Sequence, residues 1–307
     1  MHLDKDLLYR FEAGLNPQDI QASAIPAELI GYGEISAIFQ IGDDQKTAYK
    51  RMPLFADRLC AEQYEALYHE YCDLLQQAGL NLPESKTAVI PVAGRPVCLY
   101  IAQEKMPAQS FGHRLIHTQS REETAGLVEQ VVSEVAKTWR FNETRGSQLE
   151  IAVDGQISNW VFGSRNGEAI LYYIDTSTPF IRRQGVHRLD AKLILKSAPV
   201  WMRWVLEKLF VDEVLNRYYD ARKNMIDLAA NLIKEQQAGL VPMVVEVINR
   251  HLPAGSEPLT IKAVESYYRE DKFIWSLFLG VRRLDRWIVT RLLRRRYEFI
   301  LPGKIER

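Results

Sequence analysis

The chain has 307 residues, 47% of them hydrophobic, and its 39 basic and 39 acidic side chains cancel. A chain of this size can bury a large core, and its length suggests about two units of roughly 150 residues, which one bilobal enzyme would satisfy. The balanced charge provides no global field that favours nucleic acid or an anionic membrane. Three cysteines without metal-ligand spacing exclude a disulfide scaffold and a zinc ribbon, and indicate a reducing compartment.

The ends and apolar stretches of the chain indicate a cytoplasmic protein. Its first six residues carry charges of both signs and no apolar core, so we expect no signal peptide. The most apolar stretch, residues 273–281, has nine residues, and a spanning helix needs about 20. Neither an internal repeat nor a long linker interrupts the sequence, so any lobes are expected to be joined by a short connection.

The first hundred residues predict a small β-rich lobe with one helix. A turn-forming group, Gly42-Asp43-Asp44, separates the predicted strands 36–41 and 46–52 and suits a hairpin. A helical apolar period covers residues 60–79, and Glu70 lies on the same face as its apolar residues. The clearest predicted strands are residues 36–41, 46–52, 87–92 and 97–103.

Helices dominate the remainder of the chain. Ser120 and Glu123 have the spacing of a capping box at the start of a long helix. A β-like island interrupts the helices, with strands at residues 160–162 and 169–174 and a loop that ends in Asn166-Gly167. Beyond about Leu189 the pattern predicts packed helices.

Glycines and a strand lysine in the first lobe suggest a phosphate site. Gly31, Gly33 and Ser36 lie between two predicted strands, where glycines let a backbone approach phosphate oxygens and donate N–H groups to them. A tight hairpin is the alternative. Lys50 shares its strand face with apolar Met52, so its ammonium would point inward and need anionic partners. A solvated edge-strand lysine is the other interpretation.

A helix carboxylate would complete the environment of such a lysine. Glu70 is the best candidate because it lies on the apolar face of the predicted helix. A surface glutamate that only makes the helix soluble is the alternative interpretation.

The strongest signal is a loop followed by a hairpin that ends on an aspartate. Phosphoryl transfer needs an acceptor for the hydroxyl proton of the substrate, and the metal ions that bridge the phosphates need oxygen ligands. Asp154, Asn159 and Asp175 supply these groups in that order. A loop in which Asp154 and Asn159 only stabilise turns is the alternative. A strand hairpin that begins at an asparagine and ends on an aspartate is much rarer by chance.

From about Leu29 to Phe180 this order of motifs resembles the protein-kinase-like superfamily, closest in style to aminoglycoside and choline-type phosphotransferases. The resemblance implies an α+β, two-lobed fold with a β-rich N-lobe over residues 1–103 and a helical C-lobe over residues 104–307. It also implies ATP and Mg²⁺ as cofactors. The roles implied are phosphate covering by Gly31, Gly33 and Ser36, phosphate binding by Lys50 with Glu70 as its helix partner, an adenine-binding hinge at Glu104 and Met106, a catalytic base at Asp154, and magnesium ligands at Asn159 and Asp175.

Some positions depart from the superfamily pattern. Ala152 stands where the catalytic-loop histidine is usual, and Ser36 replaces a third glycine. Thr176-Ser177 stands in place of the Phe-Gly that protein kinases have after the metal-binding aspartate. Because no Ala-Pro-Glu segment follows Asp175, a small-molecule acceptor is expected rather than a protein.

The stretch from Arg282 to Arg296 combines arginines with apolar residues at 281, 284, 288 and 292. An amphipathic basic helix of this kind can dock on anionic lipid or nucleic acid. We favour the other interpretation, in which the arginines are solvated and the apolar stripe belongs to the core.

Three functions therefore compete. The leading hypothesis is an ATP- and Mg²⁺-dependent transfer of the γ-phosphoryl group to a hydroxyl of a small molecule, whose identity the sequence does not reveal. The second is a pseudokinase, a nucleotide-binding or structural module without catalysis. The third is an adaptor that binds membrane or nucleic acid through the basic helix. Nucleotide binding separates the first two from the third, and turnover separates the first from the second.

Overall fold

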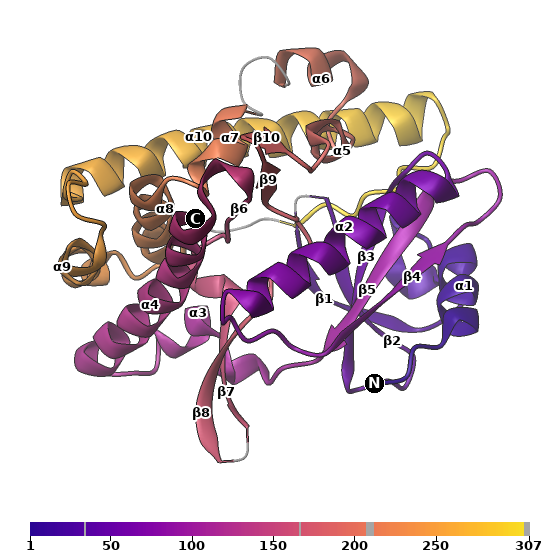
Figure 1. Ribbon diagram of the computed structural model, residues 1–307. Coiled ribbons are helices and arrows are strands. Elements are labelled where there is room, and N and C mark those ends of the chain that lie inside the picture. Colours follow the sequence, from indigo (N-terminus) through magenta and orange to yellow (C-terminus); the bar gives the residue numbers. More distant parts are fainter. Residues whose placement is uncertain (34, 166, 207–211, 304–307) are drawn as a thin grey trace.

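The computed structural model describes residues 1–33, 35–165, 167–206 and 212–303. A five-stranded antiparallel sheet with two helices forms one lobe, and the later part of the chain forms a mainly helical lobe (Figure 1). The fold class is therefore α+β with two lobes, as the sequence predicted. We call the lobe that contains the sheet the N-lobe and the helical lobe the C-lobe.

Short turns and strand alternation produce the N-lobe sheet, whose strand order is β1-β2-β3-β5-β4. The predicted turn at Gly42 is present, and this glycine has a φ of +58°, a conformation that costs glycine little. The elements of the N-lobe are α1 (Lys5–Gly14), a 3₁₀ turn (Ile20–Ala22), β1 (Ala27–Tyr32), β2 (Ala37–Ile41), β3 (Thr47–Phe55), α2 (Arg58–Gln77), β4 (Ser85–Ile90) and β5 (Val97–Glu104).

The sheet lies between α1 and α2, and β3 supplies residues to both of its faces. Tyr49 belongs to the apolar cluster that contains α1, and Met52 belongs to the cluster that contains α2 and continues into the C-lobe. Because successive side chains of a strand point to opposite faces, the neighbours Lys50 and Arg51 are directed to different sides. Lys50 faces the C-lobe and Arg51 faces α1.

The C-lobe is built around long helices that pack through aliphatic residues, with α4 against α9 and α8 against α10. Its helices are α3 (Gly112–Leu115), α4 (Arg121–Arg145), α5 (Ala191–Leu195), α6 (Val200–Leu206), α7 (Asp212–Arg217), α8 (Ala221–Lys234), α9 (Val241–His251) and α10 (Ile261–Trp287). Shorter turns are Ala108–Ser110, Gly146–Gln148, Ile157–Asn159 and Ala238–Leu240, with a π-helical turn at Ile288–Leu292. The predicted capping box starts α4, since Ser120 and Glu123 exchange both of its hydrogen bonds.

Two small sheets interrupt these helices. The predicted hairpin is present as β7 (Trp160–Arg165) and β8 (Glu168–Tyr173), and Asn166 of its predicted loop lies outside the described residues. A second sheet, not predicted, has the order β10-β9-β6 and consists of β6 (Glu150–Ile151), β9 (Ile181–Arg183) and β10 (Val186–His187). Strands of two or three residues are too short to show a period in the sequence.

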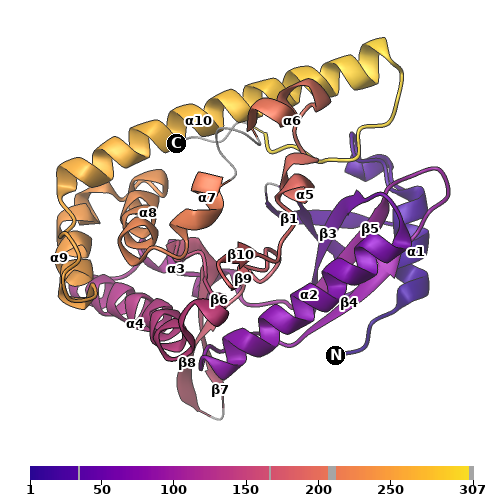
Figure 2. The same ribbon diagram turned by 45° about the horizontal axis from the view of Figure 1, so that its top comes forward.

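The chain returns to the N-lobe after α10, which extends from α9 towards the sheet (Figure 2). Glu298 then reaches a buried ionic cluster in which Arg51 donates to both oxygens of Glu12, at 2.6 and 2.8 Å, and to Glu298 Oε2 at 2.9 Å. Arg95 also contacts both carboxylates. Two guanidinium groups and two carboxylates thus fix the C-terminal segment to the N-lobe.

The apolar stripe at the end of α10 is not core, so this part of the interpretation favoured from the sequence is wrong, whereas most of the arginines are exposed as expected. Leu284 and Leu292 are 50% and 63% exposed. The buried residues of α10 are Val264, Leu279 and Arg282. The helix therefore packs through a different face from the one that its apolar period suggested.

Candidate active site

Lys50 and Asp175 meet between the two lobes. Lys50 Nζ lies 2.8 Å from Asp175 Oδ1 and donates a second hydrogen bond of 2.9 Å to Ser177 Oγ. The Ser177 hydroxyl in turn donates to Asp175 Oδ1 at 3.1 Å. The side chain of Lys50 is 11% exposed and that of Asp175 is 33% exposed. The lysine therefore points inward, and its carboxylate partner remains accessible.

Asp175 keeps its negative charge in this environment. Burial tends to raise the pKa of its carboxyl group, but the Lys50 ammonium and the hydrogen bonds from Lys50 and Ser177 outweigh burial and lower that pKa below its usual value. An ionised carboxylate beside a lysine can hold a divalent cation while the lysine binds anionic oxygens.

The β7–β8 hairpin brings Asn159 to the beginning of the Asp175 segment. Trp160 pairs with Tyr173 in the ladder, and the backbone N–H of Ile174 donates to the carbonyl of Asn159 at 3.0 Å. The amide nitrogen of Asn159 donates to the carbonyl oxygen of Asp154 at 3.3 Å. The amide nitrogen of Asn159 is therefore bonded within the loop, and the amide oxygen of Asn159 is the atom suited to bind a cation.

The pKa of Asp154 is shifted in the opposite direction from that of Asp175. Burial, then the nearby carboxylates of Asp227 and Asp175, raise its pKa well above the usual value. Its Oδ1 accepts a 3.0 Å hydrogen bond from the N–H of Gln156, whose side chain donates to Asp227 at 2.9 Å. Two carboxyl groups with oppositely shifted pKa values suit different tasks, one as a proton acceptor and the other as a permanent anion.

Residues that the sequence did not single out hold the Asp154 loop in place. Asn224 of α8 donates to the carbonyl of Val153 at 2.7 Å and accepts from the N–H of Gly155 at 3.1 Å. A Cβ at Gly155 would lie 2.5 Å from Asn224 Oδ1, so the loop and α8 fit only with glycine there. From α2, the hydroxyl of Tyr71 donates to the carbonyl of Ala152 at 2.6 Å. These contacts brace the loop at Ala152 and Gly155, on both sides of Asp154.

The pairing predicted for Glu70 is wrong in this structure. Arg183 Nη2 lies 2.6 Å from Glu70 Oε1, and Arg188 lies 3.9 Å from the other oxygen. The helix α2 contacts the site with a tyrosine instead, since Tyr64 donates to the carbonyl of Ser177 at 2.7 Å. Burial and the charge of Asp175 raise the pKa of Tyr64, so it remains a neutral donor.

The glycine-containing segment is a tight turn between β1 and β2. The N–H of Gly33 donates to the carbonyl of Ser36 at 3.0 Å. A Cβ at Gly33 would lie 2.5 Å from Ser36 Oγ, and one at Gly31 would lie 3.1 Å from Ile38 Cδ1. Both glycines therefore allow a close approach, as the hairpin interpretation requires, and a contact with phosphate stays a prediction.

The segment predicted as the hinge follows the last strand of the sheet. The N–H of exposed Glu104 donates to the carbonyl of Glu84 at 3.0 Å, and the N–H of Lys105 donates to the carbonyl of Lys46 at 2.7 Å. Met106 comes next and is partly buried. The last strand of the sheet thus ends at Glu104, and adenine binding at Glu104 and Met106 stays a prediction.

No described group of three or more His, Cys, Asp or Glu side chains is arranged to hold a metal ion. Magnesium bound to nucleotide phosphates usually takes only one or two carboxylates from the protein, and prefers oxygen ligands. Asp175, which is ionised and accessible, and the amide oxygen of Asn159 fit that requirement.

Comparisons with known proteins assign the family but no activity. No curated protein matches the sequence. The structure is similar to a solved one described as "WaaP in complex with acyl carrier protein", with 12% sequence identity, a TM-score of 0.37, and coverage of 85% of this chain and 90% of that chain. The profile of a family described as "Family of unknown function (DUF6206)" matches residues 18–286, and the chain belongs to this family.

Proposed function

We propose that this chain is an ATP- and Mg²⁺-dependent phosphotransferase that acts on a hydroxyl of a small-molecule acceptor. The observation that carries the proposal is the ion pair between Lys50 and Asp175, two residues 125 positions apart. The carboxylate follows a hairpin that begins directly after Asn159 and its loop. A lysine for phosphate oxygens and two oxygen ligands for a cation are the parts that phosphoryl transfer requires.

The chemistry of these side chains supports a separate role for each of them. Lys50 would bind phosphate oxygens, and Asp175 and Asn159 would hold Mg²⁺. Bound MgATP would supply the transferable phosphoryl group and neutralise charge on it. Asp154, whose pKa is raised, would accept the proton of an acceptor hydroxyl and orient its oxygen.

The remaining roles complete the proposed site. Gly31, Gly33 and Ser36 would cover the phosphates, and Glu104 and Met106 would line the adenine pocket. The N-lobe would end at residue 103, directly before this hinge. Glu70 has no part in the proposal because it pairs with Arg183.

A nucleotide-binding protein without turnover is the second candidate. The observation that favours it is that, among the described residues, Lys50 pairs with Asp175 and α2 contributes no carboxylate to it, together with Ala152 in place of a histidine. Binding of MgATP would then have a regulatory or structural role. Turnover therefore decides between the two candidates.

The test is phosphoryl transfer from ATP to a pool of cellular metabolites, with ATP hydrolysis as a second readout. Asp154→Asn should lower turnover about a hundred- to ten-thousand-fold, the usual contribution of a general base, and leave ATP affinity nearly unchanged. Asp73→Asn, at an exposed position of α2, is the matched control and should behave as wild type.

Two outcomes would count against the proposal. A wild-type chain that binds ATP but neither hydrolyses it nor modifies any pool component would support the second candidate. Equal turnover in wild type and Asp154→Asn would show that Asp154 is not the base.

A further inference from the structure

The outward face of α10 carries large apolar side chains. Phe273, Leu277 and Leu284 are 69%, 54% and 50% exposed. Their spacing of four and seven residues places them on one side of the helix. The residues that pack inward, Val264, Leu279 and Arg282, lie on the opposite side. This helix is therefore apolar on a face that the described fold does not cover.

Helix α6 and the end of α10 extend the same kind of surface. Val200 and Trp201 of α6 are 75% and 61% exposed, and Trp287 is 52% exposed. Arg203 of α6 and Asp285 of α10 line one cavity and interact electrostatically. Figures 1 and 2 both show α6 beside the C-terminal half of α10. Exposed aromatic groups thus occur on neighbouring elements.

The charge of this region differs from that of the whole chain. Residues 272–296 contain eight basic side chains and one acidic side chain, although the chain has no formal net charge. Arg283, Arg291, Arg294 and Arg295 are exposed. The turn that follows α10 also exposes Leu292 and Leu293, at 63% and 54%. Exposed arginines and exposed large apolar groups therefore alternate along the end of α10 and the turn that follows it.

We propose that α6, the outward face of α10 and residues 288–296, together the α6–α10 surface, dock on an anionic phospholipid bilayer. Tryptophan, phenylalanine and leucine enter the boundary between headgroups and acyl chains, and arginines remain with the lipid phosphates. Charge complementarity selects this occupant. A second copy would bring one arginine-rich surface against another, which like charges oppose. A nucleic-acid backbone would leave the apolar side chains in water.

The contact is with the membrane surface. Among the helices that the structure describes, none combines the length and the apolarity needed to cross a bilayer. The proposal goes beyond the phosphotransferase function and does not depend on it, because the surface is defined without any residue of the candidate active site.

Flotation of the full chain with lipid vesicles tests the proposal. Wild type should bind vesicles of phosphatidylcholine with phosphatidylglycerol, bind pure phosphatidylcholine weakly, and dissociate at high salt. Arg291→Ala combined with Arg295→Ala should weaken partitioning roughly 25-fold, about fivefold for each arginine. Leu277→Ser combined with Leu284→Ser should weaken it roughly tenfold through lost apolar insertion.

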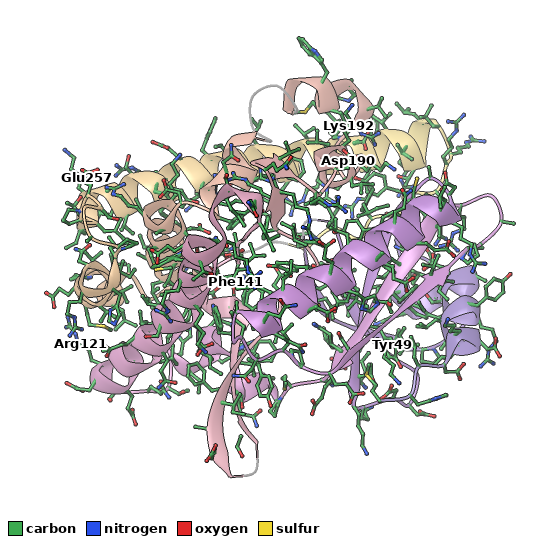
Figure 3. The ribbon with its side chains drawn as sticks, viewed as in Figure 1. Tyr49, Arg121, Phe141, Asp190, Lys192 and Glu257 are labelled. Atoms are coloured by element: carbon green, nitrogen blue, oxygen red, sulfur yellow. The ribbon has the colours of Figure 1, made fainter. Side chains whose placement is uncertain are left out.

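Matched control variants lie elsewhere on the molecule. Arg121 and Arg250 are exposed, and Figure 3 shows Arg121 at the start of α4, far from α6. Alanine at both should leave vesicle binding unchanged. Leu59 and Val186, 64% and 68% exposed, give the apolar control when both are replaced by serine. Circular dichroism checks that each variant is folded.

Three results would overturn the proposal. The first is no partitioning of folded wild type onto anionic vesicles. The second is equal loss of binding in the control variants. The third is a dimer that Leu277→Ser with Leu284→Ser converts to a monomer while wild type ignores vesicles, because the occupant would then be a second copy.

Discussion

Lys50 and Arg51 are neighbours on β3, and the structure gives their charges opposite surroundings. Lys50 faces the space between the lobes and pairs with Asp175, whose side chain is 33% exposed. Arg51 faces α1 and pairs with Glu12, and both of these side chains are only 1% exposed. One residue of strand alternation therefore separates an ion pair with a partly exposed carboxylate from one that is sealed on both sides.

This difference indicates what each pair does. Arg51 donates four hydrogen bonds, two to Glu12 and two to the side chain and backbone carbonyl of Glu298, inside a cluster that is almost fully buried. It joins α1, the sheet and the C-terminal segment. The partners of Lys50 are Asp175 and Ser177, which lie in the C-lobe segment that follows β8. A sealed pair thus serves the fold, and an accessible pair is suited to exchange a partner for a ligand.

The largest effect is expected when the sealed pair is broken. Arg51→Met should lower the free energy of unfolding by about 3–5 kcal/mol, because two buried carboxylates lose their main partner. Lys50→Met, the matched substitution one residue away, should cost less, about 1–2 kcal/mol, since Asp175 is one-third exposed and keeps the hydrogen bond from Ser177. Urea unfolding of both variants measures the difference. Equal losses would contradict the assignment of Arg51 to the fold and Lys50 to the site.

A smaller effect is expected from acid. Burial tends to raise the pKa of Glu12, but Arg51, Tyr100 and Arg95 overcome it and lower the pKa from 4.5 to about 2. The unfolded chain therefore binds this proton more readily than the folded chain as the pH falls below about 4.5. The stability that Glu12 contributes is complete above that pH, is lost progressively towards pH 2, and amounts to about 3 kcal/mol.

Unfolding midpoints measured between pH 7 and pH 2.5 test this dependence. Wild type should lose stability across that window more steeply than Glu12→Gln, which has no carboxylate to protonate. Glu70→Gln should keep the steep dependence of wild type. If wild type and Glu12→Gln lose stability in parallel, the cluster does not account for acid sensitivity.

The smallest effect is expected at Glu70. Its ion pair with Arg183 is partly exposed, so Glu70→Gln should cost no more than about 1 kcal/mol of stability. ATP affinity should stay within about twofold of wild type, because Lys50 makes its contacts elsewhere. A calorimetric titration that shows a tenfold loss would mean that Glu70 moves to Lys50 when nucleotide binds.

The sequence predicted those parts of the candidate site whose structure depends only on a few neighbouring residues. The predicted turn at Gly42 and the alternation of side chains along β3 indicated that Lys50 points inward. The predicted hairpin indicated that Asn159 lies near the segment that contains Asp175. Each of these follows from a few consecutive residues. The loop and hairpin therefore could be located from sequence alone.

Parts that depend on distant packing could not be predicted. On α2 a rotation of one residue decides whether Glu70 or Tyr71 faces the Asp154 loop, and an apolar period does not fix that rotation. Asn224 lies about 70 positions after the loop that it braces and belongs to no motif. The stripe on α10 has the period of a core helix, and only the packing of the other face shows that Leu284 is exposed.

Calorimetric titration of ATP into the chain, with and without Mg²⁺, tests whether Lys50 and Asp175 form a nucleotide site. Wild type should bind ATP more tightly with Mg²⁺, and Asp175→Asn should lose this dependence while Asp73→Asn keeps it. At a hundred times its dissociation constant, MgATP should also add about 2.7 kcal/mol to the stability of wild type. No heat with any nucleotide, or an undiminished magnesium dependence in Asp175→Asn, would contradict the assignment of Lys50 and Asp175 to a nucleotide site.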